Sequence, residues 1–386
     1  MSESQPGWFS RVWESWFGPE LSNPVAGPTW RKRIAEPPST LEARRARPRY
    51  HPPAESMHES VLPEPAPRVA PAATWVYQLQ KIDVEKIAAS SADVAVIDYS
   101  PDGDPKRPFT ADEVTRMKQK PGGGQRKLIS YMSIGEANKA CFYWDNRWVS
   151  KAGKKTSAAP GWLDKPNSSG WEGAWKVKFW DQGWQAIIID RPDSYLNKII
   201  DQGFDGVYLD IIDGYAYWMD DERGKAVRPS AGDDMVAFVA RIGEHARKVR
   251  GKADFLVVPQ NGEGLLQNVV YRNVISGIGK EDILYDMVGD ADKNPHVTKR
   301  QESGQSDKET IASIMADLTL GLAERPPVTV LAVEYLRDWP EDIPVQAATA
   351  MRMRQLGFVP YLANRDLASL CPVIEPPPGS SNVTVA

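Results

Sequence analysis

Short apolar runs alternate with amphipathic segments along the middle of the chain. The runs are bounded by glycine, proline or polar residues, which is typical of strands that are buried on both faces. We predict eight such strands, at residues 75–79, 94–97, 128–134, 207–209, 255–259, 274–278, 328–333 and 358–362. The short run at residues 177–179 is an uncertain extra strand.

The stretches between these runs carry the periodicity of helices. Leu196, Ile199 and Ile200 would share one helical face, and Gly203 stands where that helix would end. Similar faces occur at residues 235–249 and 311–322. Strands that alternate with helices in this way predict an α/β fold with a parallel sheet. Eight of them favour a (β/α)8 barrel (TIM barrel), and a doubly wound open sheet is the alternative.

Acidic residues follow most of the predicted strands. Burying a charge costs on the order of several kcal/mol unless it is paired, so folding alone does not explain an acid there. In a parallel barrel the carboxyl ends of the strands meet at one face, and active sites lie at that face. The acids in these positions are Asp98, Glu136, Asp210, Asp213, Glu263, Glu281, Asp286 and Glu334. For any single acid, a helix cap or an ion pair is the alternative.

Carboxylates that share one cleft have a definite chemical use. Like charges a few ångströms apart raise one another's pKa, so one group can hold a proton while another stays ionised. Cleavage of a glycosidic bond needs one carboxylic acid and one carboxylate. We therefore predict a sugar-cleaving site, and the neighbouring candidates for its subsites are Tyr99, Tyr131, Trp144, Tyr215 and Asn261.

Half of the 14 tryptophans fall between residues 144 and 184. This span follows the third predicted strand, and we predict that it forms a Trp-rich insertion. So long a βα insertion in a compact domain is usually functional. Flat aromatic rings can stack on sugars, or they can form a small core of their own. We expect both, with two or three rings exposed.

The composition excludes several other classes of protein. The formal charge of −4 argues against nucleic acid as a partner. Two cysteines are too few for a disulfide framework, although a single disulfide stays open. The four histidines show no metal-ligand spacing, so we expect no cofactor and no metal. An all-carboxylate Mg²⁺ or Ca²⁺ site is the alternative.

The two ends of the chain differ from its middle. Residues 1–73 are rich in proline and basic residues and poor in apolar ones, which predicts a disordered leader. Within it, residues 1–17 have an aromatic helical face suited to peripheral membrane contact. We predict a barrel domain at residues 74–370 and a flexible tail at 371–386. No signal peptide is recognisable, and the localisation and the oligomeric state stay open.

Several sequence blocks together resemble a known family. They resemble the endo-α-1,4-polygalactosaminidase family (glycoside hydrolase family 114) and its prokaryotic relatives, and the similarity extends over residues 75–366. The blocks are Trp75-Val-Tyr-Gln-Leu-Gln80, Val96-Ile-Asp-Tyr99, Ser130-Tyr-Met-Ser-Ile-Gly-Glu-Ala137, Lys178-Phe-Trp-Asp181, Gly203 to Tyr215, Pro259-Gln-Asn-Gly-Glu263, Gly277-Ile-Gly-Lys-Glu-Asp282 and Val333-Glu-Tyr335. Their number and order make the resemblance specific.

The resemblance implies a (β/α)8 barrel that hydrolyses internal glycosidic bonds of a galactosamine-containing polysaccharide. The catalytic acids proposed for the family match Asp210, as nucleophile or stabilising carboxylate, and Glu281, as proton donor; Glu263 is the alternative to Glu281. Cys141 stands where we expect an arginine, which puts one substrate contact in doubt. Family members are usually exported. The alternative function is a non-catalytic, polysaccharide-binding barrel.

Overall fold

The computed structural model describes residues 50–52, 62–70, 74–167, 173–219, 227–288, 296–303, 310–337 and 343–376. The aromatic segment 1–17 and most of the predicted leader lie outside these ranges. Within them, no helix is both long enough and apolar enough to cross a membrane.

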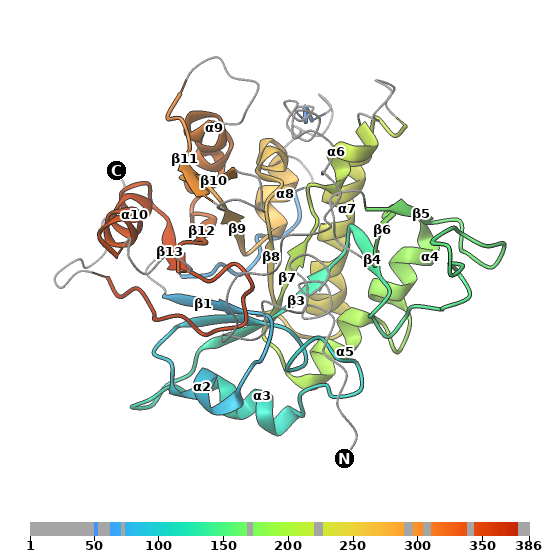
Figure 1. Cartoon of the computed structure of the whole chain (residues 1–386), viewed down its shortest axis with the longest axis horizontal. Coiled ribbons are helices and arrows are strands. Elements are labelled where there is room, and N and C mark those ends of the chain that lie inside the picture. The colour runs from blue at the N-terminus through green and yellow to red at the C-terminus, as the bar shows by residue number, and fades with distance from the viewer. Residues whose placement is uncertain are drawn as a thin grey trace, which may run out of the picture.

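Eight parallel strands form the centre of the molecule (Figure 1). Their bounds are β1 (Trp75–Gln78), β2 (Val94–Ile97), β3 (Lys127–Ser133), β7 (Gly206–Asp210), β8 (Leu256–Pro259), β9 (Gly277–Glu281), β12 (Thr329–Glu334) and β13 (Val359–Leu362). One sheet has the order β1-β2-β3-β7-β8, and the other has β9-β12-β13. The predicted α/β fold with parallel strands is confirmed.

The two sheets meet on both sides. A parallel bridge between Gln260 and Gly279 joins the end of β8 to β9. On the other side, the indole N–H of Trp75 in β1 donates to the carbonyl of Val359 in β13 at 2.9 Å. Neighbours that follow the order of the chain are typical of a (β/α)8 barrel. All eight carboxyl ends therefore face the same end of the molecule.

Helices lie on the outside of these strands (Figure 1). Those that connect parallel strands, or follow them, are α2 (Val84–Ala89), α3 (Ala111–Lys118), α5 (Tyr195–Gln202), α6 (Gly214–Met219), α7 (Ala231–Glu244), α8 (Val269–Val274), α9 (Ile311–Leu322) and α10 (Ile343–Gln355). Gly203 ends α5 with a φ of 93°, as the sequence predicted, because only glycine adopts this conformation without cost.

The sixth strand begins three residues later in the sequence than we predicted. We expected a strand at residues 274–278, but Val274 ends α8 and β9 begins at Gly277. The Asn268 side chain accepts the N–H groups of Val270 and Tyr271 and so starts a helix within a β-branched run. As a result Glu281 is the last residue of the strand rather than part of a later turn.

The chain segment between β3 and β7 forms a separate antiparallel sheet. It consists of β4 (Glu136–Asn138), β6 (Ala174–Val177) and β5 (Leu163–Pro166), in that order, and α4 (Gln182–Gln185) follows it. Val177 ends β6, so the extra run at residues 177–179 adds no strand to the barrel. A further hairpin, β10 (Tyr285–Val288) with β11 (His296–Lys299), follows β9.

The tryptophans of this insertion pack on one another. Ring centroids of Trp148 and Trp162 lie 5.2 Å apart, and those of Trp162 and Trp184 lie 4.9 Å apart. Among the six insertion tryptophans within the described ranges, three are buried, three are half-buried and none is exposed. Our expectation of two or three exposed rings is wrong for these six, because their rings supply the core that a small sheet needs.

The barrel interior is filled by aromatic side chains. Trp75, Tyr77, Tyr208 and Tyr361 are fully or almost fully buried there, with neighbouring ring centroids 5.3–6.4 Å apart. Gly279 makes room for them, since a Cβ at this position would lie 1.9 Å from the Tyr208 hydroxyl. These rings form the floor beneath the strand ends.

Two described pieces of the predicted leader pack on the barrel. The Val69 N–H donates to the Ser276 carbonyl at 2.8 Å. Tyr50 is 2% exposed and lies against Gly232, where a Cβ would stand 2.3 Å from the ring. Asn268 donates to the Tyr50 hydroxyl at 2.9 Å. The structured domain thus includes parts of residues 50–70, as it includes residues 371–376 at the other end, where the Cys371 N–H donates to Tyr361.

Replacing Tyr50 tests this contact. We expect Tyr50→Ala to lower the free energy of unfolding by about 3 kcal/mol, because a buried ring is removed next to a glycine that cannot fill the space. Tyr50→Phe keeps the ring and should cost only about 1 kcal/mol through its lost hydrogen bonds. Urea unfolding of the full chain measures both values. Equal stability of Tyr50→Ala and the unchanged protein would contradict the packing.

Candidate active site

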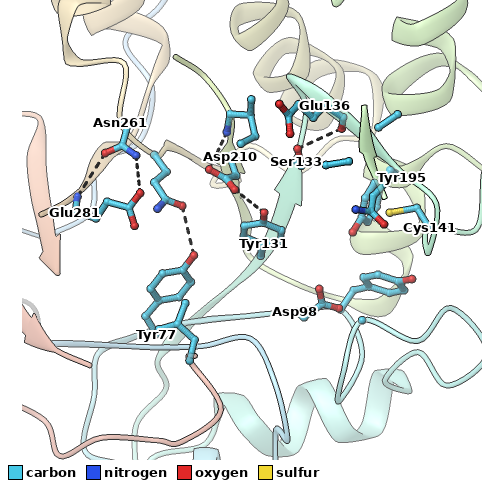
Figure 2. A pocket seen from close by; sticks show the side chains of 18 of the residues that line it. Tyr77, Asp98, Tyr131, Ser133, Glu136, Cys141, Tyr195, Asp210, Asn261 and Glu281 are labelled. Carbon is cyan, nitrogen blue, oxygen red and sulfur yellow. Dashed lines mark hydrogen bonds between the residues drawn. The ribbon is translucent and has the colours of Figure 1, made fainter. Parts of the chain in front are cut away.

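A cavity of about 270 Å³ lies at the carboxyl ends of the strands (Figure 2). Each of the eight parallel strands, or the turn that follows it, contributes to its wall. In chain order these residues are Tyr77, Asp98, Tyr131, Asp210, Gln260, Glu281, Tyr335 and Arg365. The predicted convergence of strand-end residues in one cleft is therefore present.

Asp210 ends β7, and both of its carboxylate oxygens accept a hydrogen bond (Figure 2). The Tyr131 hydroxyl donates to Oδ2 at 2.5 Å, and the backbone N–H of Ile211 donates to Oδ1 at 2.8 Å. Tyr131 lies on β3, the neighbouring strand, in register with Tyr208. The side chain of Asp210 is thus held from two sides.

Glu281 ends β9 and is held in a similar way. The Asn261 amide donates to Oε1 at 2.9 Å, and the Tyr335 hydroxyl donates to Oε2 at 2.7 Å. Asn261 follows β8 and Tyr335 follows β12, so the two strands on either side of β9 fix this carboxylate. The guanidinium of Arg365 lies 4.8 Å from the centre of the Tyr335 ring. Glu281 therefore has a cation in its surroundings.

Burial and charge set the proton affinity of Asp210. Burial raises its pKa, and so does the negative charge of Glu281, whereas the hydrogen bonds from Tyr131 and from the Ile211 N–H lower it. The resulting pKa is about 7. That Glu281 influences this value agrees with the position of both carboxylates in one cavity.

Asp98 lies in the wall near Tyr99 and is 3% exposed. Its Oδ1 accepts hydrogen bonds from the N–H and the hydroxyl of Ser100, at 3.0 and 3.3 Å. Burial nevertheless raises its pKa to about 7. Glu136 and Asp213 also line the cavity, and Glu136 accepts from Asn167 and Lys176.

Most of the candidates that sequence analysis placed in the site lie in the wall of the cavity. Eight line the cavity: Asp98, Tyr99, Tyr131, Glu136, Asp210, Asp213, Asn261 and Glu281. Trp144 does not, because its ring packs against Trp148 at 5.1 Å within the insertion. Asp286 belongs to β10, and its side chain is not among those that the structure describes.

Three further candidates are buried beside the cavity rather than in its wall. Glu263 forms an ion pair with Lys280 at 2.9 Å, and both side chains are buried. Glu334 accepts the N–H groups of Ile283 and Leu284, at 2.9 and 2.6 Å, so it supports the turn after β9. Tyr215 packs against the Tyr50 ring.

Sequence analysis missed several residues of the wall. Tyr335 and Arg365 follow the seventh and eighth strands, so the rule that located the acids would also have found them. Tyr195 and Tyr143 come from the start of α5 and from the insertion, and no strand end marks them. Cys141 also lines the cavity, and neither Cys141 nor Cys371 forms a disulfide in the described part of the chain.

No group of three or more histidine, cysteine, aspartate or glutamate side chains in the described part of the chain is arranged to hold a metal ion. Lys176 lies 3.4 Å from the cavity acid Glu136, and Arg365, which lines the cavity, lies 3.2 Å from Asp282 in the turn after β9.

Two hydrogen-bonded carboxylates in a cavity at the strand ends of a parallel α/β barrel are the arrangement that glycoside hydrolases use. Comparison with known proteins agrees. The model of glycoside-hydrolase family GH114 matches residues 58–293, and the chain belongs to this family. An uncharacterized protein of Methanocaldococcus jannaschii is 37% identical over 217 residues, which are 55% of this chain and 57% of that protein. The chain thus spans little more than half the length of this relative.

Solved structures share the fold at low sequence identity. The glycoside hydrolase domain of PelA from Pseudomonas aeruginosa is 17% identical with a TM-score of 0.55, covering 78% of this chain and 98% of that one. Ega3 of Aspergillus fumigatus, solved in complex with galactosamine, is 17% identical with a TM-score of 0.52, covering 80% and 96%. At this identity the likeness concerns the fold alone.

Proposed function

We propose that this chain is an endo-acting glycoside hydrolase that cleaves a galactosamine-containing polysaccharide with two carboxyl groups. The observation that carries the proposal is the pairing of Asp210 and Glu281 in one cavity, each held by a tyrosine hydroxyl and an N–H donor. Groups held through both oxygens keep the fixed geometry that bond cleavage requires.

Each carboxyl group has one role in this mechanism. Glu281 donates a proton to the glycosidic oxygen as the bond to the anomeric carbon breaks. Asp210, as a carboxylate, attacks the anomeric carbon or stabilises the positive charge that develops there. Tyr131 and the Ile211 N–H hold Asp210 for this step, and Tyr335 and Asn261 hold Glu281.

The charge of the cavity supports an amino sugar as the substrate. Asp98, Glu136 and Asp213 add three acids to the catalytic pair, whereas Arg365 is the one basic residue among the described residues of the wall. An excess of carboxylates attracts a polymer that carries ammonium groups. The complex of Ega3 with galactosamine, a protein of the same fold, points to the same class of sugar.

A product assay tests the proposal. Purified protein is incubated with deacetylated and with acetylated galactosamine polymers, and reducing ends and product lengths are measured. Release of short oligomers from at least one polymer is the expected result. Binding to either polymer without release of reducing ends would instead favour the alternative, a non-catalytic polysaccharide-binding barrel.

The pH dependence of hydrolysis tests the role of Asp210. The mechanism uses Asp210 ionised and Glu281 protonated at the same time, so kcat/KM should be bell-shaped in pH. Because the pKa of Asp210 is raised to about 7, one limb of the bell should have its midpoint near pH 7. Asp98→Asn is the control, because the pKa of Asp98 is also about 7: the limb should persist in this variant. A profile without a limb near pH 7, or loss of that limb in Asp98→Asn, would contradict the assignment to Asp210.

A further inference from the structure

The residue after Asp210 has an unusual backbone conformation. Ile211 has a φ of 59°, in the left-handed region. A β-branched side chain is poorly suited to this region, because its methyl groups crowd the backbone. Asn261 and Asp282, at the ends of β8 and β9, also have a positive φ, but they are residue types that tolerate it. Lys81 and Leu367, farther from the ends of β1 and β13, have a positive φ as well. Of these residues, Ile211 is the one that is β-branched and directly follows a parallel strand, so its conformation needs a structural reason.

The surroundings of Ile211 hold it in this conformation. Its carbonyl oxygen would lie 2.1 Å from a Cβ at Gly135, so only a glycine at position 135 leaves room for it. The same carbonyl accepts the Gly214 N–H at 3.2 Å, and a Cβ at Gly135 would lie 2.7 Å from the Ile211 Cγ2 methyl. Strained residues persist where neighbours over-determine them, and they cluster at functional sites.

The peptide unit between Asp210 and Ile211 holds the carboxylate and is itself fixed on its other side, because the Asp210 carbonyl accepts the Ile134 N–H at 3.1 Å. The N–H of Ile211 donates to Asp210 Oδ1 at 2.8 Å, while Tyr131 holds Oδ2. Without the Ile211 N–H, the carboxylate would be held at one oxygen and could rotate about its terminal bond. The backbone bond also favours the ionised form of Asp210, since a donor to a carboxylate lowers its pKa.

We infer that Gly135 and the left-handed backbone of Ile211 are positioning elements for Asp210: they clamp the chain directly after Asp210 and so keep the peptide unit that carries the Ile211 N–H in place beside the carboxylate. The inference rests on the proposed role of Asp210. Gly135 lies after β3 and Ile211 after β7, so the device connects two neighbouring strand ends across a contact that only a glycine permits.

Two pairs of variants test the inference. Gly135→Ala places a methyl group against the Ile211 carbonyl, and Gly161→Ala is its control, because nothing lies within 4 Å of a Cβ there. Ile211→Pro removes the N–H and fixes a negative φ, whereas Ile211→Gly keeps the N–H and permits a positive φ. Both substitutions at position 211 remove the isoleucine side chain, and they differ in the N–H, in the permitted φ and in the ring of proline.

We expect Gly135→Ala and Ile211→Pro to lower kcat by about tenfold to a hundredfold, as a displaced catalytic group does. The limb of the kcat/KM profile near pH 7 should also move to higher pH, a change that loss of stability alone does not produce. Gly161→Ala and Ile211→Gly should keep the midpoint of the unchanged protein. Thermal unfolding of all four shows which variants are folded at the assay temperature.

Unchanged kcat and an unchanged pH midpoint in Gly135→Ala or in Ile211→Pro, whichever is folded, would overturn the inference. Asp210→Asn separates this failure from that of the proposed function. If Asp210→Asn is inactive while Gly135→Ala behaves like the unchanged protein, only the positioning role is lost. If Asp210→Asn hydrolyses the polymer normally, the proposed mechanism itself is wrong.

Discussion

Asp210→Asn should lower kcat for polymer hydrolysis by about 10⁴-fold, the order of loss that follows removal of a member of a catalytic set. The amide has nearly the same shape as the carboxylate. Its oxygen can still accept the Ile211 N–H, and its NH₂ group can donate to the Tyr131 hydroxyl oxygen. The fold should therefore survive, and the loss would report the missing negative charge at the anomeric carbon.

Binding separates this result from general damage to the site. Isothermal titration of an oligosaccharide to Asp210→Asn should give an affinity within about tenfold of the unchanged protein, because one of several cavity acids is neutralised and the walls remain. Asp201→Asn is a suitable control, since Asp201 lies on α5 and pairs with Arg250 at the surface. Turnover in Asp210→Asn equal to that of Asp201→Asn would remove Asp210 from the mechanism.

The position of the site could be predicted from sequence because two regularities combine. Apolar runs mark the strands, and the carboxyl ends of parallel strands converge at one face. Asp98, Asp210 and Glu281 were found in this way without knowledge of any contact, and all three line the cavity. The rule depends on the topology of the backbone, which the alternation of strands and helices determines.

The direction of a side chain could not be predicted in the same way. Glu263 and Glu281 both follow strand ends, yet Glu263 turns to Lys280 while Glu281 enters the cavity. The different directions of these two side chains depend on where β9 begins. Asn268 caps α8, the helix ends at Val274, and β9 therefore begins three residues later than predicted. The insertion tryptophans show the same limit of prediction from sequence. The composition shows that the rings are present, but it does not show that they pack on one another.

Because the Glu281 side chain enters the cavity, its substitution should have the second large effect on hydrolysis. Glu281→Gln should lower kcat for polymer hydrolysis by about 10²- to 10⁴-fold, because the amide cannot donate a proton to the leaving oxygen. A substrate with an aryl leaving group of low pKa needs no such proton for its departure. On that substrate Glu281→Gln should retain far more of its bond-cleaving rate, whereas Asp210→Asn should not.

Glu263→Gln is the matched comparison, because it makes the same chemical change beside the cavity rather than in it. It leaves Lys280 buried without its carboxylate, so we expect the free energy of unfolding to fall by about 3 kcal/mol. At a temperature where this variant is folded, polymer hydrolysis should continue at close to the normal rate. Loss of hydrolysis in folded Glu263→Gln, together with normal hydrolysis in Glu281→Gln, would exchange the two residues in the mechanism. The ion pair with Lys280 argues against that exchange, because it holds the Glu263 carboxylate outside the wall of the cavity.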